Sequence, residues 1–265
     1  MMQRDGNSEA YDGAGFVPLG VNPGGTCRLV CFHYAGGSAQ TFFPWTKLLP
    51  EDYALLAAEL PGRGRRRDAP FVPSIRSAAQ QLAEAWGPYG DLPAIFYGHS
   101  LGALLAYETA RALKSRGQTL PELLVVSSRA APGSPTSTHT LPALSDGDLR
   151  RYLESLEGTP RAVLDSKPLM KRAIPMLRAD LQLIYDYRHE PGPALDIPIH
   201  VIGAIDDPFA PLECLLEWRS VAPAGFRLQM QGKGHFSPMR TPNAVMQAVE
   251  DHGLAPVREP IRAAS

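Results

Sequence analysis

The sequence predicts an α/β fold with a mostly parallel central sheet flanked by helices. Short apolar runs alternate with helical patterns along most of the chain, and this alternation is typical of parallel strands joined by crossover helices. The chain has 265 residues, of which 44% are hydrophobic. That length supports one large core and leaves little room for two full domains, so we expect a single sheet-based domain.

Six apolar runs are predicted to be the strands of this sheet. They are residues 28–32, 53–58, 94–97, 123–127, 199–202 and 226–230. Helical spacing of apolar side chains is found at 74–86, where Ser74 can serve as the N-cap, and from residue 101 to Gly117, a common helix stop. A closing helix is predicted at 241–251.

Residues 130–197 interrupt this alternation. They begin with a loop rich in Pro, Ser and Thr and continue with helical patterns at 146–155 and 168–187. An insertion at this point of the chain lies at the carboxyl edge of the strands, where ligands bind in such sheets. We therefore interpret 130–197 as a helical lid over the site. The alternative is that these helices only pack against the sheet.

The insertion divides the chain into four parts. Residues 23–129 and 198–255 are predicted to form the core, and 130–197 the lid. The polar, Gly-rich residues 1–22 are expected to be a disordered N-terminal arm, and 256–265 a flexible C-terminal tail.

Composition argues against several classes of function. The chain carries 26 basic and 27 acidic side chains, for a net charge of −1, so nothing favours nucleic acid as a partner. The N-terminus has no apolar signal region, and the longest apolar run, 123–126, is too short to cross a bilayer. We expect a soluble, cytoplasmic monomer that does not bind membranes.

The three cysteines do not indicate a disulfide framework, because their number is small and odd. Cys27 and Cys31 are predicted to lie on one strand, where four residues span roughly 13 Å. That separation is too large for two thiolates on one zinc ion, so we expect buried or half-buried thiols. No metal and no cofactor is predicted.

Residues 98–102 read Gly-His-Ser-Leu-Gly and lie between a predicted strand and a predicted helix. A G-x-S-x-G pattern in that context is the nucleophile turn of the α/β-hydrolase fold. The turn is so sharp that Ser100 must adopt a strained backbone, and side chains at 98 and 102 would collide with neighbouring backbone. The free N–H groups of the following helix point toward Ser100 and can stabilise an oxyanion. The sequence therefore predicts an α/β-hydrolase with Ser100 as nucleophile.

A serine hydroxyl needs a base, and in this fold the chain order is serine, acid, histidine. His235 is the candidate base because it lies in a Gly-rich loop just after the last predicted strand. Three other histidines at a useful distance after Ser100 fit less well: His189 lies in the predicted lid, His200 within a strand, and His252 at the end of the last helix.

The acid is one of two adjacent aspartates in the loop after residues 199–202. We favour Asp207, directly before a proline, over Asp206, which would then be a turn or capping residue. The oxyanion hole needs two backbone N–H groups. Leu101, after the nucleophile, should supply one, and Ala35, just before two glycines that follow the first predicted strand, should supply the other.

Several separated segments together resemble one family, the type II thioesterases. These are free-standing editing enzymes of polyketide and non-ribosomal peptide synthases. The segments are CFHYAGGS (31–38), ELPGRGR (59–65), YGHSLGA (97–103), DDP (206–208) and GKGHF (232–236). The resemblance extends over roughly residues 27 to 250. Trp45 and Trp218 also fall where the family often has tryptophan.

The resemblance implies a serine thioesterase that removes acyl groups from the phosphopantetheine arm of acyl or peptidyl carrier proteins, with Ser100, Asp207 and His235 as its triad. The family usually has Pro-His before Ala-Gly-Gly, whereas this chain has His33 and Tyr34. That departure affects the expected pocket shape and acyl preference. The alternatives are a carboxylesterase or lipase on the same fold and a non-catalytic binding protein. The latter predicts a broken triad.

A cluster of four arginines, Arg63, Arg65, Arg66 and Arg67, follows the predicted strand 53–58. Because carrier proteins are commonly acidic, the cluster could be a docking patch or a phosphate clamp. The alternative is a solvated surface loop in which Arg63 has a structural role.

Overall fold

The computed structural model describes residues 15–20, 25–134, 144–155 and 161–254. A seven-stranded sheet forms its centre, in the order β1-β3-β2-β4-β5-β6-β7. The strands are β1 (Phe16–Leu19), β2 (Cys27–Phe32), β3 (Tyr53–Ala58), β4 (Ala94–His99), β5 (Leu123–Ser127), β6 (Ile199–Ile205) and β7 (Phe226–Lys233). Only β1 pairs antiparallel; all other neighbours are parallel. The predicted fold class is confirmed.

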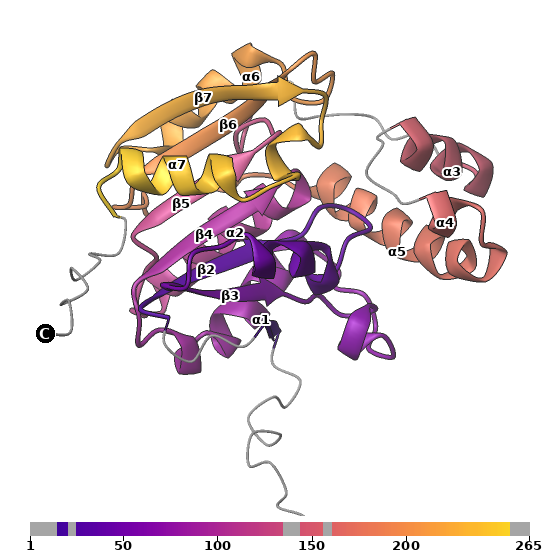
Figure 1. Ribbon diagram of the computed structural model, residues 1–265, viewed down its shortest axis with the longest axis horizontal. Helices are drawn as coiled ribbons and strands as arrows, with labels where there is room; N and C mark the ends of the chain where they lie inside the picture. Colours follow the sequence, from indigo (N-terminus) through magenta and orange to yellow (C-terminus); the bar gives the residue numbers. More distant parts are fainter. Residues whose placement is uncertain (1–14, 21–24, 135–143, 156–160, 255–265) are drawn as a thin grey trace, which may run out of the picture.

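Helices cover both faces of this sheet (Figure 1). The longer helices of the layers are α1 (Ile75–Ala85), α2 (Leu101–Ser115) and α7 (Asn243–Asp251), with the short α6 (Leu212–Leu216) beside them. Alternate residues of the buried strands share one apolar cluster with α1 and α2, and the intervening residues share a second cluster with α7. This division follows from the period of two along a strand, which sends successive side chains to opposite faces.

Three further helices stand together beyond one edge of the sheet: α3 (Asp146–Ser155), α4 (Arg161–Leu164) and α5 (Lys167–Asp186). In Figure 1 they lie on the side toward which the arrow of β7 points, which is the carboxyl edge of the strands. Their apolar side chains form a cluster of their own, including Leu153, Ile174 and Leu177. Ser166 caps α5 by accepting a hydrogen bond from the backbone of Leu169.

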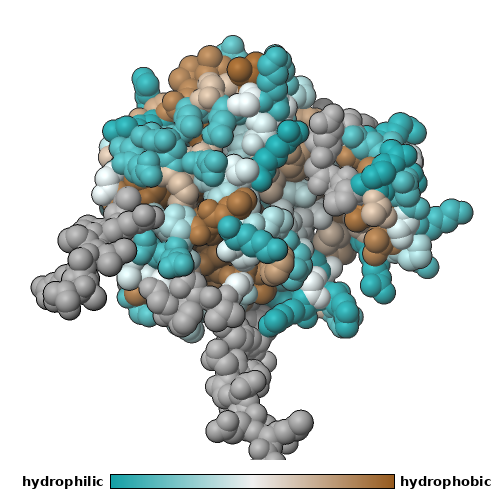
Figure 2. Space-filling view, in the orientation of Figure 1, coloured by the Kyte–Doolittle hydropathy of each residue, from teal (hydrophilic) through white to brown (hydrophobic). Residues whose placement is uncertain are grey.

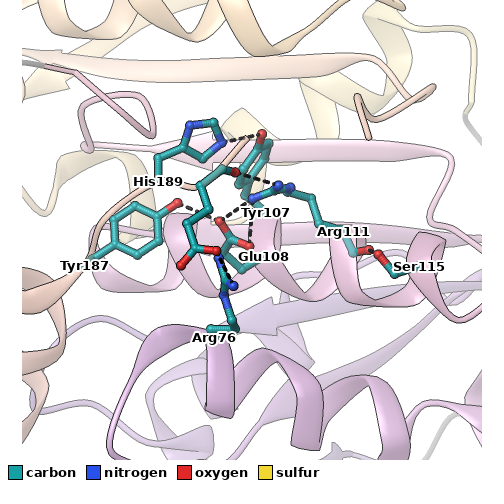
Figure 3. Close-up of polar contacts among 8 residues, drawn as sticks. Arg76, Tyr107, Glu108, Arg111, Ser115, Tyr187 and His189 are labelled. Carbon is teal, nitrogen blue, oxygen red and sulfur yellow. Dashed lines mark hydrogen bonds and ion pairs between the residues drawn. The ribbon is translucent and has the colours of Figure 1, made fainter. Parts of the chain in front are cut away.

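The segment after α5 is fixed to the core by polar contacts (Figure 3). The hydroxyl of Tyr187 donates to Glu108 on α2 at 2.7 Å, and Arg111 pairs with the same carboxylate. Arg111 also donates to the backbone oxygen of Glu190, whose side chain pairs with Arg76 of α1. The backbone just after β5 is also fixed to the core, because the indole N–H of Trp218 donates to the backbone oxygen of Arg129 at 2.8 Å.

The predicted elements match the observed ones closely at 53–58, 123–127 and 146–155, and Ser74 caps α1 as expected. The predicted N-terminal arm was wrong over residues 16–19, which form β1. Phe16 is 5% exposed and packs its ring against Trp86, Tyr89 and Phe32. This burial holds a short edge strand that hydropathy alone does not reveal. The rest of that arm, the loop 135–140 and the predicted tail lie outside the described residues.

The cysteines are buried free thiols, as expected. Burial and the nearby Glu122 raise the pKa of Cys27 to about 12, and burial raises that of Cys31 well above its usual value. In the part of the chain that the structure describes, no group of side chains could hold a metal ion. Within the same residues, no helix is both long and apolar enough to cross a membrane. Hydrophilic side chains cover much of the face in Figure 2, with separate apolar areas between them.

Candidate active site

Ser100 lies at the turn between β4 and α2 with φ 55° and ψ −114°. Few residues other than glycine adopt this backbone, so the turn stores strain. A side chain at Gly98 would overlap the backbone of Gly102, and one at Gly102 would overlap the backbone of Phe32. The N–H of Ser100 donates to the oxygen of Ser127 at 2.9 Å, which ties the turn to β5.

His235 and Asp207 contact each other at the same edge of the sheet. The Nδ1 atom of His235 lies 3.0 Å from both carboxylate oxygens of Asp207, and both side chains are buried. Asp206 points elsewhere: it is exposed and has a φ of 60°. The structure therefore brings His235 together with the favoured aspartate and not with its neighbour.

Opposing effects act on the Asp207 carboxyl. Burial raises its pKa. The hydrogen bond and charge of His235 and the N–H of Phe209 lower the pKa by more than burial raises it, so the net shift is downward. The carboxylate thus stays ionised and can only accept hydrogen bonds. Nδ1 of His235 must then carry the proton, which leaves the lone pair on Nε2 free to take one.

The imidazole of His235 is packed between aromatic rings. The rings of His99, Phe209 and Phe236 lie 5.0, 5.2 and 5.3 Å from it. Burial and the neighbouring His235 hold the pKa of His99 well below its usual value, so His99 adds no charge here. The hydroxyl of Ser128, itself at a φ of 51°, donates to the backbone oxygen of His235 at 3.0 Å and fixes its loop.

The loop after β2 forms a tight turn that contains Ala35. The N–H of Gly37 donates to the oxygen of Tyr34 at 2.9 Å, and Gly36 has a φ of 80°, the pattern of a type II turn. The N–H groups of Ala35 and Leu101 form no hydrogen bond with any residue that the structure describes. Two backbone donors are thus available at the loop and the helix start from which an oxyanion hole is built in this fold.

A cavity of about 600 Å³ lies against this turn. The turn, the His235 loop and the helices α3 and α5 line it, among them Tyr34, Leu153, Met176, Leu177, Phe236 and Met239. The ring of Tyr34 packs 4.7 Å from that of Phe236, so the departure from the usual Pro-His pair shapes the cavity wall. A second cavity of about 650 Å³ adjoins it and shares Ser38, Val163, Ala173 and Met176.

The fold and the order of the site residues define a hydrolase of the α/β-hydrolase class, in which serine, acid and histidine follow one another along the chain at the carboxyl edge of the sheet. The model of the thioesterase domain family matches residues 27–252. The chain belongs to this family and is a thioester hydrolase.

Relatives from biosynthetic pathways are similar over most of their length. The gramicidin S biosynthesis protein GrsT of Aneurinibacillus migulanus is 32% identical, with 83% of this chain and 86% of that protein covered. Thioesterase PikA5 of Streptomyces venezuelae is 34% identical, with 88% and 83% covered. The solved structure of the type II thioesterase BorB from the borrelidin biosynthetic cluster is 31% identical, covers 90% of this chain and 97% of that one, and has a TM-score of 0.78. The predicted resemblance to type II thioesterases is confirmed.

Two groups of residues at this site were not predicted from the sequence. Ser127, Ser128 and His99 hold the nucleophile turn and the histidine loop together, and serines at the end of a buried strand give no sequence signal. Asp180 of α5 was also missed. It accepts the N–H of Gly36 at 2.8 Å, inside the Ala35 turn.

Proposed function

We propose that this thioesterase removes acyl groups from the phosphopantetheine arm of acyl or peptidyl carrier proteins and so clears stalled or aberrant chains in a biosynthetic pathway. Ser100, Asp207 and His235 are its proposed catalytic residues. The buried Asp207–His235 pair, at the same sheet edge as the strained Ser100, is the observation that carries the proposal. The similarity to GrsT, a gramicidin S biosynthesis protein, and to BorB, from the borrelidin biosynthetic cluster, supports the pathway class.

In the proposed mechanism, Ser100 Oγ attacks the thioester carbonyl while His235 Nε2 takes its proton. The N–H groups of Ala35 and Leu101 stabilise the oxyanion, and Asp207 stabilises the imidazolium. Collapse of the tetrahedral intermediate breaks the C–S bond, and the leaving thiolate takes the proton from His235. Water then attacks the acyl-serine with His235 again as base, which releases the acid and restores Ser100.

The helices α3, α4 and α5 are proposed to act as the lid over this reaction. Leu153 of α3, Val163 of α4 and Leu177 of α5 all line the cavity of about 600 Å³. Its lining is largely apolar, which suits an acyl chain. Closing such a cavity excludes water that is not needed for deacylation.

The proposed substrate class is tested by presenting one acyl group in three forms: on a phosphopantetheinylated carrier protein, on free pantetheine, and as an O-ester of similar size. We expect kcat/KM to be highest for the carrier and at least about 100-fold lower for the ester, because a thiolate is a better leaving group than an alkoxide and depends less on the proton from His235. Equal values for ester and thioester would instead favour the carboxylesterase or lipase alternative.

Only two of the four arginines in the cluster are fully exposed. Arg63 is buried, and Arg66 is half-buried with its guanidinium on the backbone oxygen of Glu59. Arg65 and Arg67 are exposed, and Arg67 lines the cavity of about 650 Å³ together with Arg172. We propose that these exposed arginines bind the acidic surface of the carrier protein or the phosphate of its phosphopantetheine arm.

The variant Arg65→Glu/Arg67→Glu reverses the charge of this patch. It should raise KM for the acyl-carrier substrate about 10-fold at low salt and leave KM for acyl pantetheine unchanged. Arg116→Glu, beyond the far end of α2, is the matched control and should change neither. Equal effects on both substrates, or none on either, would remove the docking proposal.

A further inference from the structure

A buried ion pair joins three segments that are distant in the sequence. Arg63 donates from Nη1 and Nη2 to the two carboxylate oxygens of Asp180, both at 2.7 Å. Arg63 belongs to the turn after β3, and Asp180 belongs to α5. Each partner also bonds the Ala35 turn: Asp180 accepts from the N–H of Gly36 at 2.8 Å, and Arg63 donates to the oxygen of Gly37 at 3.1 Å.

Stability alone is a weak reason for such a pair. The side chains of Arg63 and Asp180 are 2% and 1% exposed, so both charges have lost nearly all their hydration. Apolar residues in place of a buried ion pair are often equally stable or more stable, because the desolvation cost disappears. His33 adds no charge that would offset this cost, because burial, and next the charge of Arg63, lower its pKa to about 4, so His33 is neutral at pH 7. The Glu59 carboxyl, also close to Arg63, bonds the N–H of Ala39 instead.

The bonds to the turn give the pair a specific geometric effect. In a type II turn the central peptide, here Ala35–Gly36, can flip and convert the turn to another type. Asp180 accepts the N–H of that peptide, and Arg63 holds the oxygen of Gly37 on its far side. The peptides before Gly36 and after Gly37 are therefore fixed, and the N–H of Gly37 between them donates to the oxygen of Tyr34. Ala35 keeps its N–H without a partner among the described residues.

We propose that Arg63 and Asp180 are positioning residues for the oxyanion hole: from the core and from α5, they clamp the turn that presents the Ala35 N–H. This inference rests on the proposed function, since it assigns the clamp to the oxyanion of that reaction. It makes α5 a fixed part of the active site, although it lies in the segment proposed as the lid. A donor aimed at developing charge acts in the transition state, so loss of the clamp should lower kcat and leave KM nearly unchanged.

The test compares three variants with the wild type on acyl pantetheine. Asp180→Asn keeps the size but has only one acceptor oxygen for Arg63 and Gly36, and kcat should fall about 10- to 100-fold. In Arg63→Met/Asp180→Leu the buried charges disappear together, so the thermal midpoint should stay within a few degrees of the wild type while kcat stays low. Arg178→Met is the control: it breaks the ion pair of Arg178 with Asp146, which joins α5 to α3 without touching the turn, and kcat should be unchanged.

A second readout is the affinity for a boronic acid that mimics the tetrahedral intermediate, which should fall by the same factor as kcat/KM. If the double variant has both the thermal midpoint and the kcat of the wild type, the pair is merely structural and the proposal is overturned. Should Asp180→Asn fail to fold, the double variant decides alone. A wild type that turns over neither acyl pantetheine nor the acyl carrier protein refutes the proposed function instead, so the two failures are distinguishable.

Discussion

Replacement of Ser100 by alanine should lower the turnover of an acyl thioester by at least about 10⁴-fold, because no other group in the proposed mechanism can form the acyl-enzyme. The fold should survive. The strained backbone at φ 55° belongs to the turn between β4 and α2, and alanine adds no atom that could clash there. Thermal unfolding and hydrolysis of acyl pantetheine measure the two effects separately.

Covalent labelling with a fluorophosphonate gives an independent readout of the same change. The wild type should carry one adduct, on Ser100, and the alanine variant none. Ser115→Ala, at the other end of α2, is the matched control and should label normally. Substantial turnover by the Ser100 variant would refute the mechanism, and an unlabelled wild type would favour a non-catalytic binding protein.

Asp207→Asn should lower kcat by about 10³- to 10⁴-fold, the second large effect. An amide at 3.0 Å from His235 Nδ1 can turn its NH₂ toward the ring and select the wrong tautomer, with the proton on Nε2. Asp206→Asn is the matched control in the adjacent position. Asp206 is exposed at a φ of 60°, a backbone that asparagine tolerates, so its kcat should change less than about threefold. A larger loss at 206 than at 207 would reverse the assignment.

The sheet could be predicted because its inner strands are continuous apolar runs, and a run that is buried on both faces is visible in the sequence. The ends of β6 and β7 could not. Their pairing continues past a register irregularity between Gly203 and Ile205, and an irregularity of this kind leaves no signal in the hydropathy pattern. β1 was missed for a related reason: it is an edge strand of four residues, including Pro18, that depends on Phe16.

The choice between Asp206 and Asp207 rested on local preference alone in the sequence, whereas in the structure their orientations differ sharply. Asp180, by contrast, leaves a signal in the sequence. Ile174, Leu177 and Leu181 form the buried face of α5, and Asp180 falls on that face. A carboxylate within an apolar stripe needs a buried partner, but the sequence cannot say that the partner is Arg63.

The anchoring of α5 has a consequence for how new specificities arise. Tyr187, directly after its last turn, is bonded to Glu108, and Asp180 within it is bonded to Arg63. Leu153 and Val163, which also line the cavity, come from α3 and α4 instead. Grafting α3 and α4 from a relative would therefore alter the lining of the cavity of about 600 Å³ while the Asp180 bonds stay in place. The acyl selectivity would then change through α3 and α4, while the rate, which depends on the Asp180 bonds of α5, would be kept.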